Sequence, residues 1–219
     1  MLSFVLGQSG TGKTEYLYNK FCEKAKAGDN KLLFIVPDQC SFETEKVFLD
    51  RLGPMLCQNV KVFGFSRLCD YVFENMGMLY SSFADEGIRH VIMSLALDEV
   101  YDSLTLFSKR ASSYDLAELM LNAVKEYKKC SISTAMLYDA SEKCTDEILS
   151  QKLYETALIY ETYTALIEKS YIDPLDSLSK TAKILSDNDL FSGYTVAVDS
   201  FFGFTHQEYD VLECLIGQS

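Results

Sequence analysis

The chain has 219 residues, 48% of them hydrophobic, and a formal net charge of −12. This length suits one or two domains and allows a real hydrophobic core. No apolar run reaches the ~18 residues that a membrane-spanning helix needs. No signal peptide is visible either, which predicts a cytoplasmic protein without a membrane partner.

The negative charge is unevenly distributed along the chain. Residues 1–80 carry nine Lys and Arg and nine Asp and Glu, whereas residues 81–219 carry eleven against twenty-three. Acidic surfaces repel phosphate backbones, so we expect this chain on its own to bind DNA weakly or not at all. The acidic half is also compatible with ordinary solvated helix faces.

Seven cysteines are scattered through the sequence without a C-x-x-C pair, at positions 22, 40, 57, 69, 130, 144 and 214. An odd count without metal-ligand spacing predicts reduced, mostly buried thiols. The same spacing argues against a metal or iron–sulfur site in this segment.

The first predicted element is a buried strand at residues 2–6, a short apolar run that contains Val and Phe. A glycine-rich segment follows it directly and fits G-x-x-x-x-G-K-[ST], the P-loop pattern. This segment consists of Gly7, Gln8, Ser9, Gly10, Thr11, Gly12, Lys13 and Thr14. A helix is predicted to begin near Lys13, because apolar residues recur after it at helical spacing.

Each residue type in this segment suits phosphate binding. Gly7, Gly10 and Gly12 lack a Cβ, so backbone N–H groups can curl around an anion. The positive end of the predicted helix points to the same place. Lys13 can reach the β- and γ-phosphates, and the Thr14 hydroxyl can bind Mg²⁺. A chance glycine-rich turn is the alternative, but the order of strand, loop and helix favours a phosphate site.

The following residues continue as strands that alternate with helices. Strands are predicted at residues 31–37 and 60–63, and helices at residues 41–52 and 66–76, the second capped by Ser66. This alternation is typical of a parallel sheet with helices on its faces.

From residue 85 to residue 170 the pattern is helical, without a convincing strand. The apolar face of the first helix is predicted to consist of Ile88, Val91, Ile92, Leu95 and Val100. We therefore divide the chain into an α/β domain, residues 1–84 and 171–219, and an all-helical insertion, residues 85–170.

The last part of the chain returns to the α/β pattern. Asp173 followed by proline marks the start of a helix, because proline suits the first helical position. A strand is predicted at residues 194–199 and a closing helix at residues 206–216.

A P-loop site needs a carboxylate at the end of a second strand, where Asp holds Mg²⁺ and a neighbouring Glu orients the attacking water. Asp199 ends an apolar, β-branched run and suits the first role, although a simple turn residue is the alternative. Ser200 stands where the Glu is expected, and a hydroxyl cannot replace a carboxylate base at neutral pH. Glu208 is a rival base, and His206 is more typical of a structural residue. The sequence thus predicts nucleotide and metal binding without fast hydrolysis.

Four stretches resemble the N-terminal segment of the AddB family, which forms the B chains of bacterial AddAB helicase-nucleases. They are the P-loop at residues 7–14, residues 36–45 (V-P-[DE]-Q-x-[ST]-F-x-x-E in the family), residues 62–68 (V-x-S-F-x-R-L) and residues 198–207 (I-D-G-F-x-x-F-T-P-x-Q). Their order, with a long helical segment before the last, resembles domain 1A of a superfamily-one helicase interrupted by domain 1B.

The sequence departs from these family patterns at four positions. Gly64 replaces a Ser, Ser200 replaces a Gly, and His206 replaces a Pro. Gln207 falls one place earlier than the family's Gln.

The resemblance implies a P-loop, RecA-like parallel sheet with a large all-helical insertion, incomplete within these 219 residues. It implies ATP on residues 7–14 and Mg²⁺ on Thr14 and Asp199. Contacts with DNA or between motifs would fall on Gln39, Ser66, Arg67 and Gln207. It further implies a heterodimer with an A subunit, which binds DNA as a full complex and resects double-strand breaks for recombinational repair.

The resemblance also implies a strand order. In the sheet of such domains, the strand that follows the Asp199 stretch in sequence lies between the P-loop strand and the strand that ends in Asp199. The chain ends one helix after Asp199, so we expect this central strand to be missing. Unpaired buried backbone groups cost about 1–3 kcal/mol each. We therefore expect marginal stability, a poorly ordered Asp199 loop, and an Asp199 too far from Thr14 to share a metal.

Two alternative interpretations of the P-loop stay open at this point. The first is a free-standing, active P-loop NTPase or small-molecule kinase. The second is an interaction module whose P-loop binds no nucleotide. Measuring nucleotide binding together with turnover distinguishes these two interpretations from the helicase-like one.

Overall fold

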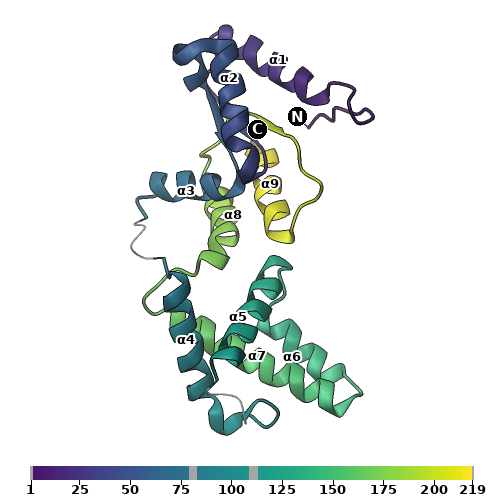
Figure 1. Cartoon of the computed structure of the whole chain (residues 1–219), viewed down its shortest axis with the longest axis vertical. Coiled ribbons are helices and arrows are strands. Elements are labelled where there is room, and N and C mark those ends of the chain that lie inside the picture. The colour runs from purple at the N-terminus through teal and green to yellow at the C-terminus, as the bar shows by residue number, and fades with distance from the viewer. Residues whose placement is uncertain (1, 79–82, 109–112, 219) are drawn as a thin grey trace. The chain divides into compact units, whose positions relative to one another are not determined.

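The structure, a computed structural model, describes residues 2–78, 83–108 and 113–218 (Figure 1). Over these residues the protein is α/β and mostly helical, with one three-stranded parallel sheet. The chain divides into two compact units. Met1–Gly77 and Leu178–Ser219 form one, here the sheet unit, and Met78–Ser177 forms the other, here the helical unit.

The sheet contains the strands predicted near residues 31–37, 60–63 and 194–199. β1 (Leu32–Ile35) lies in the middle, between β2 (Val60–Phe63) and β3 (Thr195–Val198). Both neighbours run parallel to it, and Ile35 is in register with the last residue of each. All four residues of β1 are buried, as expected for a parallel strand covered on both faces.

Helices cover both faces of this sheet. α1 (Lys13–Lys26) and α2 (Ser41–Leu56) pack on one face. α3 (Phe65–Asn75), α8 (Ser177–Asp187) and α9 (His206–Gln218) pack on the other. The alternation along β1 produces these two layers, because its odd- and even-numbered side chains point to opposite faces. The first core contains Phe21, Leu32, Phe34, Phe48 and Val62, and the second contains Leu33, Ile35, Leu68, Phe191 and Val211.

The prediction of a strand at residues 2–6 is wrong. These residues have neither helix nor strand, and Phe4 and Leu6 are 77% and 88% exposed. A strand is stable only when neighbouring strands satisfy its N–H and C=O groups. β3 pairs only with β1 among the described strands, so nothing joins residues 2–6 to the sheet.

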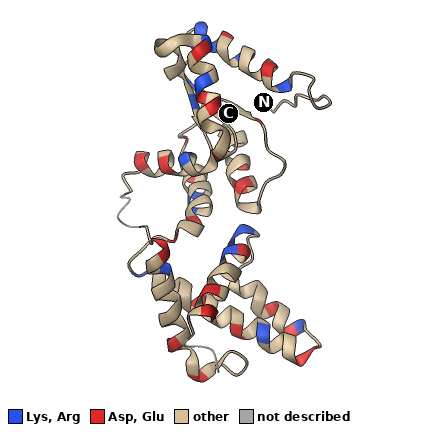
Figure 2. Ribbon diagram, viewed as in Figure 1, with Lys and Arg blue, Asp and Glu red and all other residues tan. Residues whose placement is uncertain are grey.

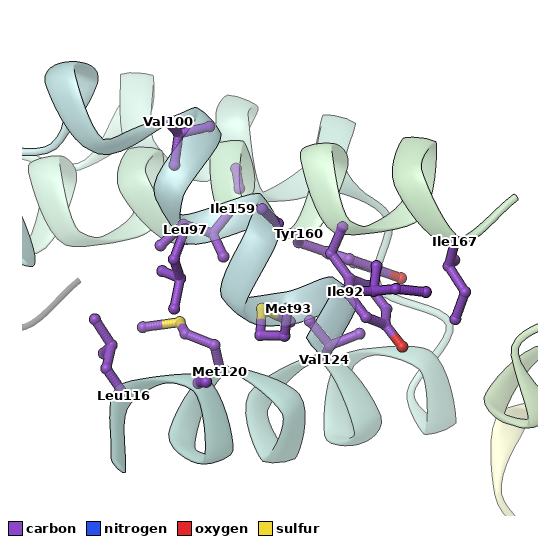
Figure 3. Close-up of a cluster of buried hydrophobic side chains, with 14 of the residues drawn as sticks. Ile92, Met93, Leu97, Val100, Leu116, Met120, Val124, Ile159, Tyr160 and Ile167 are labelled. Carbon is purple, nitrogen blue, oxygen red and sulfur yellow. The ribbon is translucent and has the colours of Figure 1, made fainter. Parts of the chain in front are cut away.

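The helical unit contains α4 (Glu86–Glu99), α5 (Tyr114–Lys129), α6 (Thr134–Lys143) and α7 (Glu147–Ile167). An isolated parallel bridge joins Phe83 to Ile172 in the same unit. Side chains of α4, α5 and α7 form its core (Figure 3). Capping residues stand at two of the helix starts, since Ser113 and Asp146 accept hydrogen bonds from the first-turn amides of α5 and α7.

The predicted apolar face of α4 is only partly right. Ile92 and Val100 are buried, whereas Val91 is 60% and Leu95 53% exposed. Met93 and Leu97 are fully buried instead and point into the space between α4 and α5 (Figure 3). α4 is apolar around much of its circumference, so its contacts with α5 and α7 decide which face is buried.

Acidic residues outnumber basic ones in the helical unit, with seventeen Asp and Glu against nine Lys and Arg in residues 78–177. They are spread over several helices and do not form one cluster (Figure 2). This distribution fits solvated helix faces. In the described parts of the chain, no helix is both long and apolar enough to cross a membrane.

All seven cysteines are free thiols, as predicted, but only Cys22 and Cys69 are buried. Burial raises the pKa of the Cys69 thiol to about 11, which makes it unreactive at neutral pH. Cys130 is exposed and the other four are half-buried, so the prediction of mostly buried thiols is wrong.

Candidate functional site

The glycine-rich segment forms a loop that leads into the first turn of α1. Gly10 and Gly12 have φ angles of 78° and 85°, in the left-handed region that favours glycine. Gly7 is needed for a different reason, because a Cβ there would lie 2.5 Å from Thr11 Oγ1. The Thr11 hydroxyl itself donates a 2.8 Å hydrogen bond to the Gln8 carbonyl. The turn is therefore built locally, by its glycines and one hydroxyl.

Lys13 lies over this loop. Its Nζ donates hydrogen bonds of 2.8 Å to the carbonyl oxygens of Gly7 and Gln8. Gly12 is the N-cap of α1 and has no side chain to cap the helix, so the first-turn amides are available to an anion. An ammonium group, a glycine turn and uncapped amides together fit the phosphates of a nucleotide.

α1 is fixed against α2 by an ion pair that sequence reasoning missed. Arg51 of α2 donates to both carboxylate oxygens of Glu15, at 2.9 and 2.7 Å, and to Asn19 at 3.0 Å. These hydrogen bonds with Arg51 lower the pKa of the Glu15 carboxyl. The Arg51 guanidinium also lies 5.2 Å from the centre of the Tyr18 ring. A Glu in the first turn of a helix is expected simply because it stabilises the positive helix end. Its sequence position therefore gave no indication of a partner on another helix.

The three strands end at one edge of the sheet, and their following residues meet there. Asp199 directly follows β3, and its N–H donates to the Ile35 carbonyl at 3.0 Å. The amide of Val36 donates to the Phe63 carbonyl at 3.0 Å. Ligand sites of parallel α/β sheets form at this carboxyl edge.

Asp38 and Gly64 come into close contact at this edge. A Cβ on Gly64 would lie 1.9 Å from Asp38 Oδ1 and 2.8 Å from Asp38 Cα. The Ser66 hydroxyl donates to Asp38 Oδ2 at 2.9 Å. The prediction that Ser66 caps α3 is therefore wrong. Gly64 holds the N-cap position, and Ser66, the second residue of α3, links this helix to the segment after β1.

The other predicted contact residues have different surroundings. Gln39 is exposed next to Asp38. Arg67 Nη1 donates to Glu45 Oε1 at 2.5 Å, and its guanidinium lies 5.8 Å from the centre of the Phe63 ring. Gln207 is buried, and its amide donates to the Ser179 hydroxyl of α8 at 3.1 Å. Gln39 and Arg67 are thus accessible at the carboxyl edge, and Gln207 packs inside the sheet unit.

Neither Ser200 nor Glu208, the two candidates for a base after β3, offers a free carboxylate. Ser200 has a φ of 67°, and its hydroxyl lies 3.4 Å from Asp199 Oδ2. Glu208 accepts a 2.7 Å hydrogen bond from the Thr205 amide, and its own amide donates to the Thr205 hydroxyl at 3.3 Å. This reciprocal pair is a capping box at the start of α9. Glu208 is therefore committed to the helix end.

Aromatic rings of the segment that follows Asp199 pack against Phe65, a feature that sequence reasoning missed. Phe65 packs against Phe201 and Phe204, with ring centres 5.5 and 6.3 Å apart. Phe202, between them in sequence, is fully exposed. The run of three phenylalanines after the Asp stretch was the only available signal. No group of three or more His, Cys, Asp or Glu with metal-ligand geometry occurs over the described residues.

Comparison with known proteins gives one consistent result. A family model described as "ADDB, N-terminal" matches residues 4–219. The chain is similar to proteins named as the B subunit of an ATP-dependent helicase/deoxyribonuclease. The identity is 29% to that of Clostridium acetobutylicum, 30% to that of Clostridium tetani and 31% to that of Caldanaerobacter subterraneus subsp. tengcongensis. Each alignment covers 98% of this chain but 19% of the relative, so the chain spans about a fifth of their length.

Proposed function

This chain belongs to the AddB N-terminal family, and we propose that it is a nucleotide-binding, helicase-like segment of a helicase-nuclease. In this proposal it binds ATP through residues 7–14 and hydrolyses it slowly or not at all. The relatives are named as ATP-dependent and as subunits, which supports a role for ATP and a partner chain in the whole protein.

The loop geometry around Lys13 is the observation that carries the proposal. Two left-handed glycines, a Gly7 without room for a Cβ, and an uncapped helix start lie within eight residues. The hydrogen bonds of Lys13 to two loop carbonyls keep the ammonium beside the same turn. Phosphate oxygens are better acceptors for an ammonium than neutral carbonyls, so a nucleotide would compete for Lys13 successfully.

Slow turnover follows from the groups near Asp199. Ser200 cannot act as a general base at neutral pH, and Glu208 is engaged in the cap of α9. Mg²⁺ would be held by Thr14, and by Asp199 only where a further strand brings it within reach, and it would neutralise phosphate charge when bound. That shared metal site stays a prediction.

Function in the cell would require the rest of the protein. We propose that the full-length protein pairs with an A subunit in the cytoplasm and acts with it on DNA ends in double-strand break resection and recombinational repair. The acidic composition of this chain argues that DNA affinity resides in the full complex. Within this chain, exposed Gln39 and the neighbouring Ser66 and Arg67 are the proposed DNA or motif contacts, while buried Gln207 is suited to a structural contact.

Calorimetry with ATP and Mg²⁺, combined with a turnover assay on the same sample, tests this proposal. Wild-type protein should bind ATP, and Lys13→Ala should abolish binding. Lys20→Ala, on an exposed position of the same helix, is the matched control and should bind as wild type.

Three outcomes are distinguishable in this experiment. Binding with negligible turnover supports the proposal. A kcat near the typical ~10 s⁻¹ favours a free-standing NTPase. Absence of binding to a folded wild-type sample favours an interaction module with an unused P-loop.

A further inference from the structure

A pocket of about 300 Å³ lies between α4 and α5 inside the helical unit. The first turn of α4 and one face of α5 line it, and these helices pack on each other. A single water has a share of about 30 Å³ in the liquid, so this space is much larger than one hydration site. It reaches the lower end of the range for small-ligand pockets.

Arg89 lines this pocket without a hydrogen-bond or ion-pair partner among the described residues. Its Nε is buried and unpaired, and its guanidinium forms no hydrogen bond or ion pair with the part of the chain that the structure describes. The other two described arginines are both paired with carboxylates, Arg51 with Glu15 and Arg67 with Glu45. An arginine that is half-buried and unpaired is unusual, because unsatisfied buried donors are costly.

His90 is the second unsatisfied group of this pocket. Its Nε2 is buried without a hydrogen-bond partner. Its ring stacks on Tyr114 of α5, with ring centres 4.3 Å apart and an angle of 25° between the planes. The stacking fixes the imidazole on the wall that α4 and α5 share.

The carboxylates of the same pocket do not satisfy these groups. Glu86 and Glu118 line it, but both are exposed, and neither comes within ion-pair distance of Arg89. Lys125 of α5 lines the pocket as a further cation. Buried nitrogens of Arg89 and His90 therefore lack hydrogen-bond partners, and solvated carboxylates lie on exposed positions of the pocket lining.

We propose that this pocket binds a small oxyanion, a phosphate or carboxylate group, through Arg89, His90 and Lys125. A guanidinium presents several N–H donors and pairs well with such groups. The pocket holds about 300 Å³ between two packed helices, so the ligand must be a small molecule. The phosphate backbone of a nucleic acid is too bulky for that position.

Histidine NMR provides a specific probe, because His90 and His206 are the two histidines of the chain. His90 lines the pocket, and His206 begins α9 in the sheet unit. The Lys13→Ala variant of the full 219-residue chain is titrated with sodium phosphate or sodium acetate, so that the P-loop does not contribute. Sodium chloride at equal ionic strength is the control, and His206→Asn assigns the two resonances.

The His90 resonance should shift and saturate with phosphate, acetate or both, while the His206 resonance stays in place. A response to phosphate alone identifies a phosphoryl ligand, and a response to acetate identifies a carboxylate. Arg89→Gln should weaken binding about tenfold or more, in line with the loss of a charged hydrogen bond. Lys125→Gln, on an exposed position, should weaken it less, and Lys152→Gln, on an exposed position of α7 outside the pocket lining, should leave it unchanged.

A His90 shift that chloride reproduces would overturn the site, as would an affinity that Arg89→Gln and Lys125→Gln leave intact. A short oligonucleotide that shifts His90 more strongly than phosphate would overturn the assignment to a small ligand. ATP binding by wild-type protein is measured separately, so failure of this site and failure of the P-loop proposal are distinguishable.

Discussion

Replacing Glu155 by Gln tests whether one buried carboxylate holds the segment after α4 onto α7. Glu155 is fully buried. Its Oε1 accepts from the Thr105 amide and hydroxyl, at 2.8 and 2.7 Å, and from the Leu106 amide at 2.9 Å. The Gln151 amide donates to the same oxygen at 2.9 Å, and the Phe107 amide donates to Oε2 at 3.0 Å. Every partner of this carboxylate is a donor.

These hydrogen bonds determine how much the charged form contributes. Burial alone raises the pKa of Glu155, but the donors from Gln151, Leu106, Thr105 and Phe107 together outweigh burial and lower it from 4.5 to about 2. At ~1.4 kcal/mol for each pKa unit, the ionised carboxylate contributes about 3 kcal/mol to the free energy of unfolding. The folded-state pKa is depressed, so this contribution is complete above about pH 5 and is lost as the pH falls towards 2.

Glu155→Gln should therefore lower the free energy of unfolding by about 3 kcal/mol at pH 7, because its amide places an NH₂ group against backbone N–H donors. The difference from wild type should fall to about half at pH 3. Urea unfolding followed by circular dichroism measures both values. Glu161→Gln is the matched control, since Glu161 is exposed on the same helix and accepts one hydrogen bond, from Tyr138. A loss no larger than that of the control, or one that is constant from pH 7 to pH 3, would refute the reasoning.

Three further substitutions probe the backbone and the buried charges. Gly64→Ala should destabilise the sheet unit by about 1–3 kcal/mol, because the new Cβ meets the backbone of Asp38; urea unfolding of the variant measures this. Ser200→Gly should raise the free energy of unfolding by about 1 kcal/mol, since Ser200 has a left-handed backbone; an unchanged urea midpoint would contradict it. Lys128→Met should cost about 3–5 kcal/mol, because it leaves the buried carboxylate of Asp173, now 2.8 Å from Lys128 Nζ, without its cation. A thermal scan that shows no decrease would contradict this last value.

The elements that the sequence predicted well are those with strong local signals. β1 is a short apolar run bounded by a turn and a proline, and it needs no knowledge of its neighbours to be recognised as a buried strand. Helix caps are local signals of the same kind, because Ser113 and Asp146 bond to amides of their own helices, α5 and α7.

The features that sequence reasoning missed all depend on contacts between distant residues. Ser66 resembles a helix cap in sequence, but Asp38, 28 positions away, accepts its hydroxyl. Glu155 resembles any polar residue of a long helix, and its donors lie about 50 positions earlier. Spacing along one helix carries no information about such partners, because it records only which side chains share a face.

The two parts of the candidate nucleotide site, residues 7–14 and Asp199, also differ in whether local or distant contacts position them. The conformation of residues 7–14 depends on glycine backbones, the Thr11 hydroxyl and the hydrogen bonds of Lys13, all of them local. The loop therefore forms even though residues 2–6 have no strand partner among the described residues. The position of Asp199 depends instead on β3, and its relation to Thr14 depends on what pairs with the free edge of that strand. The proposed phosphate site would thus depend on eight residues, whereas the proposed metal site shared with Asp199 would also depend on the sheet. Under the proposed function, this separation would let the chain bind a nucleotide even where the groups needed for hydrolysis are absent.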